Sequence, residues 1–140
     1  MPSNVARFEA LMYLSVAIGV GLFSTEWPTI ASKVQASEMR LVLLIFVSAT
    51  VVRLALIWLT ARKRQNWARW VLLVLVLLGL PQFLKTLGPL LNEHPLLWAV
   101  RIGQFALDIV AFVLIFTGDS REWFNPTPDP MANIRTESPI

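Results

Sequence analysis

The chain has 140 residues, of which 56% are hydrophobic and only 15% charged, and its formal net charge is +3. Its mean hydropathy of +0.62 lies above the range of ordinary soluble domains and indicates a single membrane-embedded domain. The absence of cysteine from the sequence excludes disulfide bonds, iron–sulfur clusters and thiol catalysis. The basic residues stand at the ends of apolar segments, where they set membrane topology, so the positive charge does not indicate nucleic-acid binding.

The first apolar segment predicts a membrane helix over about residues 5–25. A cleavable signal peptide is the alternative, because Arg7, the apolar run and later small residues meet its general requirements, although the run is long and Glu9 interrupts its start. Two pairs of small residues on this helix would let another backbone approach closely: Ser15 with Gly19, and Ala17 with Gly21. The same residues are also explained by the general frequency of glycine in membrane helices.

Three further apolar segments predict helices over about residues 39–61, 67–87 and 96–117. A polar connection is expected at residues 26–40, with Pro28 after the end of the first helix and Ser37 as the N-cap of the second. Prolines predict a turn at residues 85–95, and Gly118 is the expected C-cap of the last helix.

Four membrane spans place both termini on the same side. If that side is the cytoplasm, the inner basic residues are Arg7, Arg62, Lys63, Arg64, Arg69, Arg121 and Arg135, and the outer ones are Lys33, Arg40 and Lys85. This bias agrees with the positive-inside rule. We therefore expect an all-α, four-helix transmembrane bundle over residues 1–124 with cytoplasmic termini, followed by a disordered, proline-rich tail at residues 125–140.

The last predicted helix carries a line of polar residues in an otherwise apolar span. Arg101, Gln104 and Asp108 share one helix face, which must turn toward other helices or water because an ionised group in hydrocarbon is costly. Counted from the outer ends of their helices, Arg53 and Asp108 both lie about 18 to 20 Å below the outer surface, at ~1.5 Å per residue. We therefore expect these two residues to form a buried ion pair within a polar seam.

The alternative leaves this pair apart, with the arginine extended to the cytoplasmic interface and the aspartate protonated. Glu9 is a rival partner for the arginine, but its position near the cytoplasmic edge fits Arg62 or Arg69 better. Arg101 needs an acceptor of its own. The candidates at matching depth or at the outer surface are Gln82, Glu93 and Glu38.

No residues in the sequence indicate catalysis or a bound cofactor. His94 is the only histidine, and it stands in an exterior turn without a second ligand at metal-binding spacing. No glycine-rich phosphate loop or redox motif occurs, and no nucleophile with its base can be named. We therefore expect a protein that is not an enzyme and that uses no cofactor or metal ion.

Two short motifs lie at the expected cytoplasmic surface, RQNWAR at residues 64–69 and SREWF at residues 120–124. We expect them to form a structural clasp, with Trp123 or Phe124 packed on Trp67, and with Arg69 near Asp119 or Glu122. The same surface can attract anionic lipid headgroups. The residues assigned to it are Arg62, Lys63, Arg64, Asn66, Trp67, Arg69, Arg121, Trp123 and Phe124.

With these motifs, the chain resembles a broad group of small bacterial four-helix membrane proteins over roughly residues 40 to 124. The resemblance implies a location in the bacterial inner membrane and brings no established activity. Small multidrug transporters and dual-topology fluoride channels are similar in size but resemble the chain poorly. The former carry an acidic residue in the middle of the first helix, where this chain has Val16 to Ile18, and dual insertion requires a weaker charge bias than this one.

The function expected from the sequence is that of a small inner-membrane accessory or interaction subunit, held together by the Arg53/Asp108 seam. A homo-oligomeric channel or small transporter, with Arg101, Gln104 and Asp108 along its path, is the first alternative. A membrane immunity protein against a toxin is the second. The expected partners are the lipid bilayer and either another membrane protein or further copies of the chain, and nucleic acid is not among them.

Overall fold

A computed structural model describes residues 2–120 and Phe124. Over these residues the chain forms four α-helices: α1 (Ser3–Lys33), α2 (Ala36–Ala61), α3 (Asn66–Glu93) and α4 (Pro95–Phe116). Each helix is long and apolar enough to cross a membrane. The all-helical class and the four apolar helices expected from the sequence are therefore confirmed. The tail predicted at residues 125–140 lies outside the described residues.

The first helix is longer than the sequence rules predict. α1 continues through Pro28 to Lys33, so the polar connection expected at residues 26–40 shrinks to Val34 and Gln35. Ser37, the expected N-cap of α2, lies inside the first turn of that helix, and the N-cap is Gln35. The expectation was wrong because a proline that ends a helix in water is tolerated in a membrane helix, where its neighbours can satisfy the freed carbonyl.

The third helix departs from the prediction in the same way. α3 runs through Pro81 and Pro89 to Glu93, so the turn expected at residues 85–95 is absent and His94 alone connects it to α4. α4 begins at Pro95, because the first position of a helix needs no backbone N–H donor. Its C-cap is Thr117, one residue before the position expected, and Gly118 follows it with the left-handed φ of +61° that glycine adopts easily.

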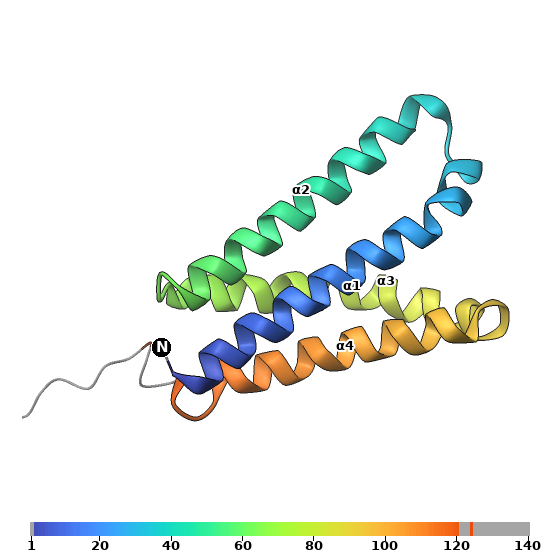
Figure 1. Cartoon of the computed structure of the whole chain (residues 1–140). Helices are drawn as coiled ribbons and strands as arrows, with labels where there is room; N and C mark the ends of the chain where they lie inside the picture. Colours follow the sequence, from blue (N-terminus) through green and yellow to red (C-terminus); the bar gives the residue numbers. More distant parts are fainter. Residues whose placement is uncertain (1, 121–123, 125–140) are drawn as a thin grey trace, which may run out of the picture.

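The helices are arranged in chain order around a ring. α1 contacts α2 and α4, α3 contacts α2 and α4, and the contact between α1 and α4 is the most extensive. Figure 1 shows that the start of α1 and the end of α4 lie at the same end of the molecule. We call this the core end, and we call the opposite end, where α1 passes to α2 and α3 to α4, the open end.

The hydrophobic core is concentrated at the core end. Its buried residues come from the first parts of α1 and α3, the last parts of α2 and α4, and one residue after α4. They are Val5, Phe8, Met12, Leu56, Ile57, Ala61, Ala68, Leu72, Ala111, Phe112, Ile115 and Phe124. Toward the open end, α2 stays beside α1, where Phe23 stacks on Phe46, and diverges from α3 and α4 (Figure 1). The core therefore holds the helices together at one end only.

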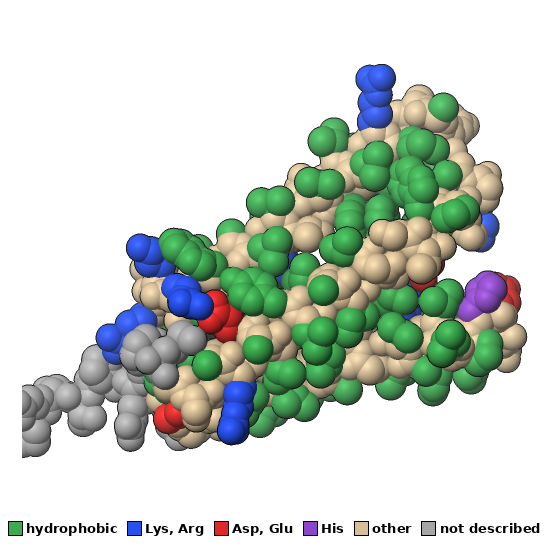
Figure 2. Space-filling view, viewed as in Figure 1, with side chains coloured by type: hydrophobic (Ala, Val, Ile, Leu, Met, Phe, Trp, Pro, Cys, Tyr) green, Lys and Arg blue, Asp and Glu red, His purple; other side chains and the backbone are tan. Residues whose placement is uncertain are grey.

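The outer faces of the helices are apolar. Leu44 on α2 is 64% exposed and Leu78 on α3 is 70% exposed. In Figure 2, hydrophobic side chains cover the flanks of the helices, while Lys and Arg side chains gather mainly near the core end. This distribution matches helices whose flanks face lipid and whose ends face water.

Candidate functional site

Arg53 on α2 and Asp108 on α4 form the ion pair expected from their depth. Arg53 Nη2 lies 2.6 Å from Asp108 Oδ1, and the same nitrogen is 3.3 Å from the hydroxyl of Ser15 on α1. The Asp108 side chain is only 8% exposed. Desolvating a lone carboxylate is costly, and the guanidinium offsets much of that cost. The contact ties three helices together at one depth, and the arrangement with Arg53 extended to the interface is not the one found.

A second ion pair joins α1 to the end of α2. Arg62 Nε lies 2.9 Å from Glu9 Oε1. Of the two partners predicted for Glu9, Arg62 and Arg69, the structure therefore has Arg62. The Glu9 side chain is buried and that of Arg62 is largely exposed. The hydrogen bond and the negative charge of Glu9 raise the pKa of Arg62 above its usual value. Arg62 therefore remains charged, and this pair locks the core end.

The partner predicted for Arg101 is wrong. Arg101 Nη2 lies 2.5 Å from Oε1 and 2.6 Å from Oε2 of Glu26 on α1, so the candidates Gln82, Glu93 and Glu38 are not its acceptors. Glu26 was not among the predicted partners of Arg101, because residues 26–40 were expected to form a connection between helices. Glu26 lies seven residues before the end of α1, and Arg101 lies six residues after the start of α4. The same depth count that paired Arg53 with Asp108 would have found it, had α1 been continued through Pro28.

Gln104 completes the polar seam by contacting the small residues of α1. Its Nε2 donates a hydrogen bond of 3.0 Å to the backbone carbonyl of Ser15, which is fully buried. A Cβ at Gly19 would lie 2.9 Å from that nitrogen, so Ser15 and Gly19 form a close-packing pair, as expected. Ala17 and Gly21 do not: both are exposed, and a Cβ at Gly21 would meet nothing within 4 Å in the described residues. They project from a different side of the helix.

The clasp expected at the core end forms around Arg69. The Arg69 guanidinium lies 4.9 Å from the ring centroid of Phe116 and 4.6 Å from that of Phe124. Phe124 therefore packs on Arg69 and not on Trp67, the partner that we expected. Trp67 is 53% exposed and donates its indole N–H to Gln65. Arg121, Glu122 and Trp123, also assigned to the clasp, lie outside the described residues. A flat guanidinium stacks well on aromatic rings, which explains the arrangement.

Asp119 has a different role from the one expected. Its Oδ2 accepts hydrogen bonds from the backbone N–H of Ser3 at 2.9 Å and from the Ser3 hydroxyl at 3.2 Å. It thus caps the N-terminus of α1, where a carboxylate also interacts favourably with the helix dipole. The remaining residues of the predicted surface lie along the α2–α3 connection. Lys63 stands over the Trp58 ring, Arg64 has a positive φ of 55°, and Asn66 begins α3.

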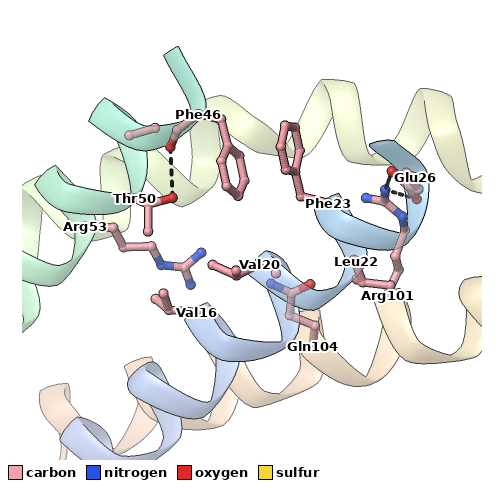
Figure 3. Close-up of a pocket in the computed structure, with 12 residues that line it drawn as sticks. Val16, Val20, Leu22, Phe23, Glu26, Phe46, Thr50, Arg53, Arg101 and Gln104 are labelled. Carbon is pink, nitrogen blue, oxygen red and sulfur yellow. Dashed lines mark hydrogen bonds and ion pairs between the residues drawn. The ribbon is translucent and has the colours of Figure 1, made fainter. Parts of the chain in front are cut away.

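Two cavities lie beside the polar seam, and the larger one reaches the core at Leu72. The larger has a volume of ≈ 540 Å³ and lies between α2, α3 and α4, and the smaller, of ≈ 320 Å³, lies between α1, α2 and α4. Arg53, Arg101 and Gln104 line both of them. Figure 3 shows the smaller cavity, with Arg53 and Gln104 reaching toward it from two different helices.

The chain matches no protein-family model, and no curated protein or solved structure is significantly similar to it. The resemblance suggested by the RQNWAR and SREWF motifs therefore remains a hypothesis drawn from the residues. The function has to be inferred from the geometry of the seam and its cavities.

The chemistry available at the seam is that of charge pairing and hydrogen bonding. In the described part of the chain, no group of three or more His, Asp or Glu residues could hold a metal ion. The polar groups next to the cavities are the two guanidinium groups, two carboxylates, the Gln104 amide and the hydroxyls of Ser48 and Thr50. Such groups can fix the packing of helices and can bind an oxyanion or another polar group.

Proposed function

We propose that the protein is a non-enzymatic, multi-pass protein of the bacterial inner membrane that serves as an accessory or interaction subunit of a membrane complex. The observation that carries this proposal is the set of arginine–carboxylate pairs among the described residues, which link α2 to α4, α1 to α2 and α1 to α4. A matched pair cancels its own charge, and a buried pair fixes the position of its helices. This pattern favours a structural role for the seam.

The charge distribution supports cytoplasmic termini. The connection between α2 and α3, at the core end, contains the basic residues Arg62, Lys63 and Arg64 and no acidic residue. Short loops rich in arginine and lysine remain in the cytoplasm. The core end is then the cytoplasmic end, and the open end with its divergent α2 faces the outer side of the membrane.

Copurification tests the accessory role. Tagged wild-type protein is purified in a mild detergent, and the mass of the intact complex is measured alongside the Asp108→Asn variant and the control Glu93→Gln, whose site is exposed. We expect the wild type and the control to retain another membrane protein, and Asp108→Asn to lose it because the seam no longer orders the helices. A lone homo-oligomer whose assembly ignores both substitutions would contradict the proposal.

A channel or small transporter is the second candidate, favoured by the cavities that Arg53, Arg101 and Gln104 line. It would require the Arg53–Asp108 pair to separate, and the packed cluster at the core end to open, in every transport cycle. This requirement makes it the weaker candidate. Ion flux through liposomes containing the pure protein would favour it. Toxin immunity, the third hypothesis from the sequence, gains no support from the site.

A further inference from the structure

Arg53 and Arg101, which lie beside the cavities, have N–H donors that make no hydrogen bond within the described residues. Within the described residues, every hydrogen bond of these two side chains uses Nη2. Their Nε atoms are buried and have no partner there. A guanidinium carries five N–H donors, and a buried donor without a partner is unfavourable. Both side chains line both cavities and remain about one-quarter exposed, so an acceptor group bound at this point could use N–H donors of the guanidinium groups that the ion pairs leave unused.

The charge balance differs between the two cavities. The charged residues lining the smaller cavity are Arg53, Arg101 and Glu26, and Glu26 already binds Arg101 through both of its oxygens. The larger cavity has the same two arginines and Asp108, which contacts Arg53 through a single oxygen. Glu26 does not line the larger cavity. At the larger cavity each of the two guanidinium groups is paired with one carboxylate, and the N–H donors that these pairs leave unused favour an oxyanion as the acceptor.

Apart from its charged residues, Ser48 and Gln104, the residues that line the larger cavity are apolar. Its wall on α3 consists of Leu72, Leu75, Val76, Gly79, Leu80 and Phe83. Phe83 stacks on Phe105 of α4, with 4.7 Å between the ring centroids, so the wall continues onto that helix. The volume of ≈ 540 Å³ falls within the range of about 300 to 1,000 Å³ that is usual for small-molecule sites.

We propose that the larger cavity binds an anionic amphiphile, with its oxyanion at Arg53 and Arg101 and its hydrocarbon chain along the wall of α3. An amphiphile matches both halves of the cavity, whereas a free inorganic anion would leave the apolar wall unused. The bilayer supplies such molecules at high local concentration. Toward the open end α2 diverges from α3 and α4 (Figure 1), the two helices that line the larger cavity with it, so a chain can enter laterally from the membrane. The oxyanion can be the carboxylate of a free fatty acid or the phosphate of an anionic phospholipid.

Native mass spectrometry of the full chain in dodecyl maltoside tests the proposal. The probes are oleate, oleyl alcohol with the same chain and no charge, dioleoyl phosphatidylglycerol, and inorganic phosphate. We expect one oleate or one phosphatidylglycerol per chain, bound at least tenfold more tightly than oleyl alcohol, and no retained phosphate. Preference for oleate identifies a fatty acid as the source of the oxyanion, and preference for phosphatidylglycerol identifies a phospholipid. Equal binding of oleate and oleyl alcohol would overturn the proposal.

Two variants locate the binding. Gly79→Leu places a side chain into the larger cavity, since a Cβ there meets nothing within 4 Å in the described residues. It should reduce the affinity for the anionic probe at least tenfold. The control is Gly103→Leu, at a glycine that is equally open but lines neither cavity. If Gly79→Leu and Gly103→Leu lost affinity equally, or if neither lost affinity, the assigned position of the ligand would be contradicted.

The second variant tests the head group without stranding a charge. Arg101→Gln combined with Glu26→Gln removes both members of one pair and leaves the hydrocarbon wall intact. We expect the preference for oleate over oleyl alcohol to fall at least fivefold, with the affinity for oleyl alcohol unchanged. An unaltered preference would show that the arginine does not bind the oxyanion, and the proposal would fail.

Discussion

The side chains of Arg53 and Asp108 meet across α2 and α4, with 2.6 Å between Nη2 and Oδ1, although they are 55 residues apart in sequence. The carboxylate is almost fully buried, and the guanidinium also reaches Ser15 on α1. One contact therefore fixes three of the four helices at a common depth.

A double-mutant cycle on this pair measures its contribution. Asp108→Leu alone strands the arginine and should lower the free energy of unfolding by about 3 kcal/mol, as should Arg53→Met alone. The double variant should lie within about 1 kcal/mol of the wild type, because no charge is left unpaired. Reversible unfolding in mixed micelles of sodium dodecyl sulfate and dodecyl maltoside provides the measurement. A coupling energy of only ~0.6 kcal/mol, the average for hydrogen bonds between membrane helices, would mean that the ion pair is unimportant.

The identity of the Arg101 partner is tested by two glutamate variants. Glu26→Gln removes the carboxylate that both contacts of Arg101 use, and we expect it to lower stability by about 1 to 3 kcal/mol, because hydrogen bonds to charged groups contribute about that much. Glu93→Gln, at an exposed residue, should change stability by less than about 0.5 kcal/mol. The same unfolding assay compares them, and the reverse order of effects would restore the pairing expected from the sequence.

The two glycines of α1 should respond differently to alanine. Alanine in place of glycine stabilises a helix by roughly 0.5 to 1 kcal/mol, and Gly21→Ala should show this gain. At Gly19 the added methyl group would lie 2.9 Å from Gln104 Nε2, so the amide must shift, and we expect its hydrogen bond to the Ser15 carbonyl to weaken. Gly19→Ala should therefore be less stable than Gly21→Ala by about 1 kcal/mol. Equal stability of the two variants would show that the α1–α4 contact is looser than described.

The stacking of Arg69 predicts that lysine cannot replace it. Arg69 is 7% exposed, and its guanidinium lies over the rings of both Phe116 and Phe124. Arg69→Lys keeps the charge but loses the planar contact, and we expect a loss of about 1 to 2 kcal/mol in the free energy of unfolding. Arg7→Lys, at an exposed position on α1, is the matched control and should be neutral. A neutral Arg69→Lys would mean that packing of Phe124 does not depend on the guanidinium.

Hydrophobic run length and charge predicted the four helices and the central contact of the site. Arg53 and Asp108 lie on α2 and α4, whose ends fall within a few residues of the predicted ones, so counting residues gave correct relative depths. The Ser15–Gly19 face was found for a related reason, because small residues at this spacing are required where backbones approach.

The failures have a common physical origin. Proline was treated as the end of a helix, and this shortened α1 at Pro28 and α3 before Pro89. Glu26 was thereby placed in a loop and lost as the partner of Arg101. The partners of Arg69 and Asp119 depend on where Asp119 and Phe124 lie after the end of α4, which residue spacing within one helix cannot predict.

The claim on which the rest depends is that the helices cross the membrane with the core end in the cytoplasm. Because the chain contains no cysteine, single cysteines can report which side each connection occupies. His94→Cys and Lys63→Cys, at exposed residues of opposite ends, are treated with a membrane-impermeant maleimide in intact spheroplasts. The account predicts labelling of His94→Cys in intact cells and of Lys63→Cys only after the membrane is permeabilised. Labelling of both in intact cells, or of Lys63→Cys alone, would contradict it.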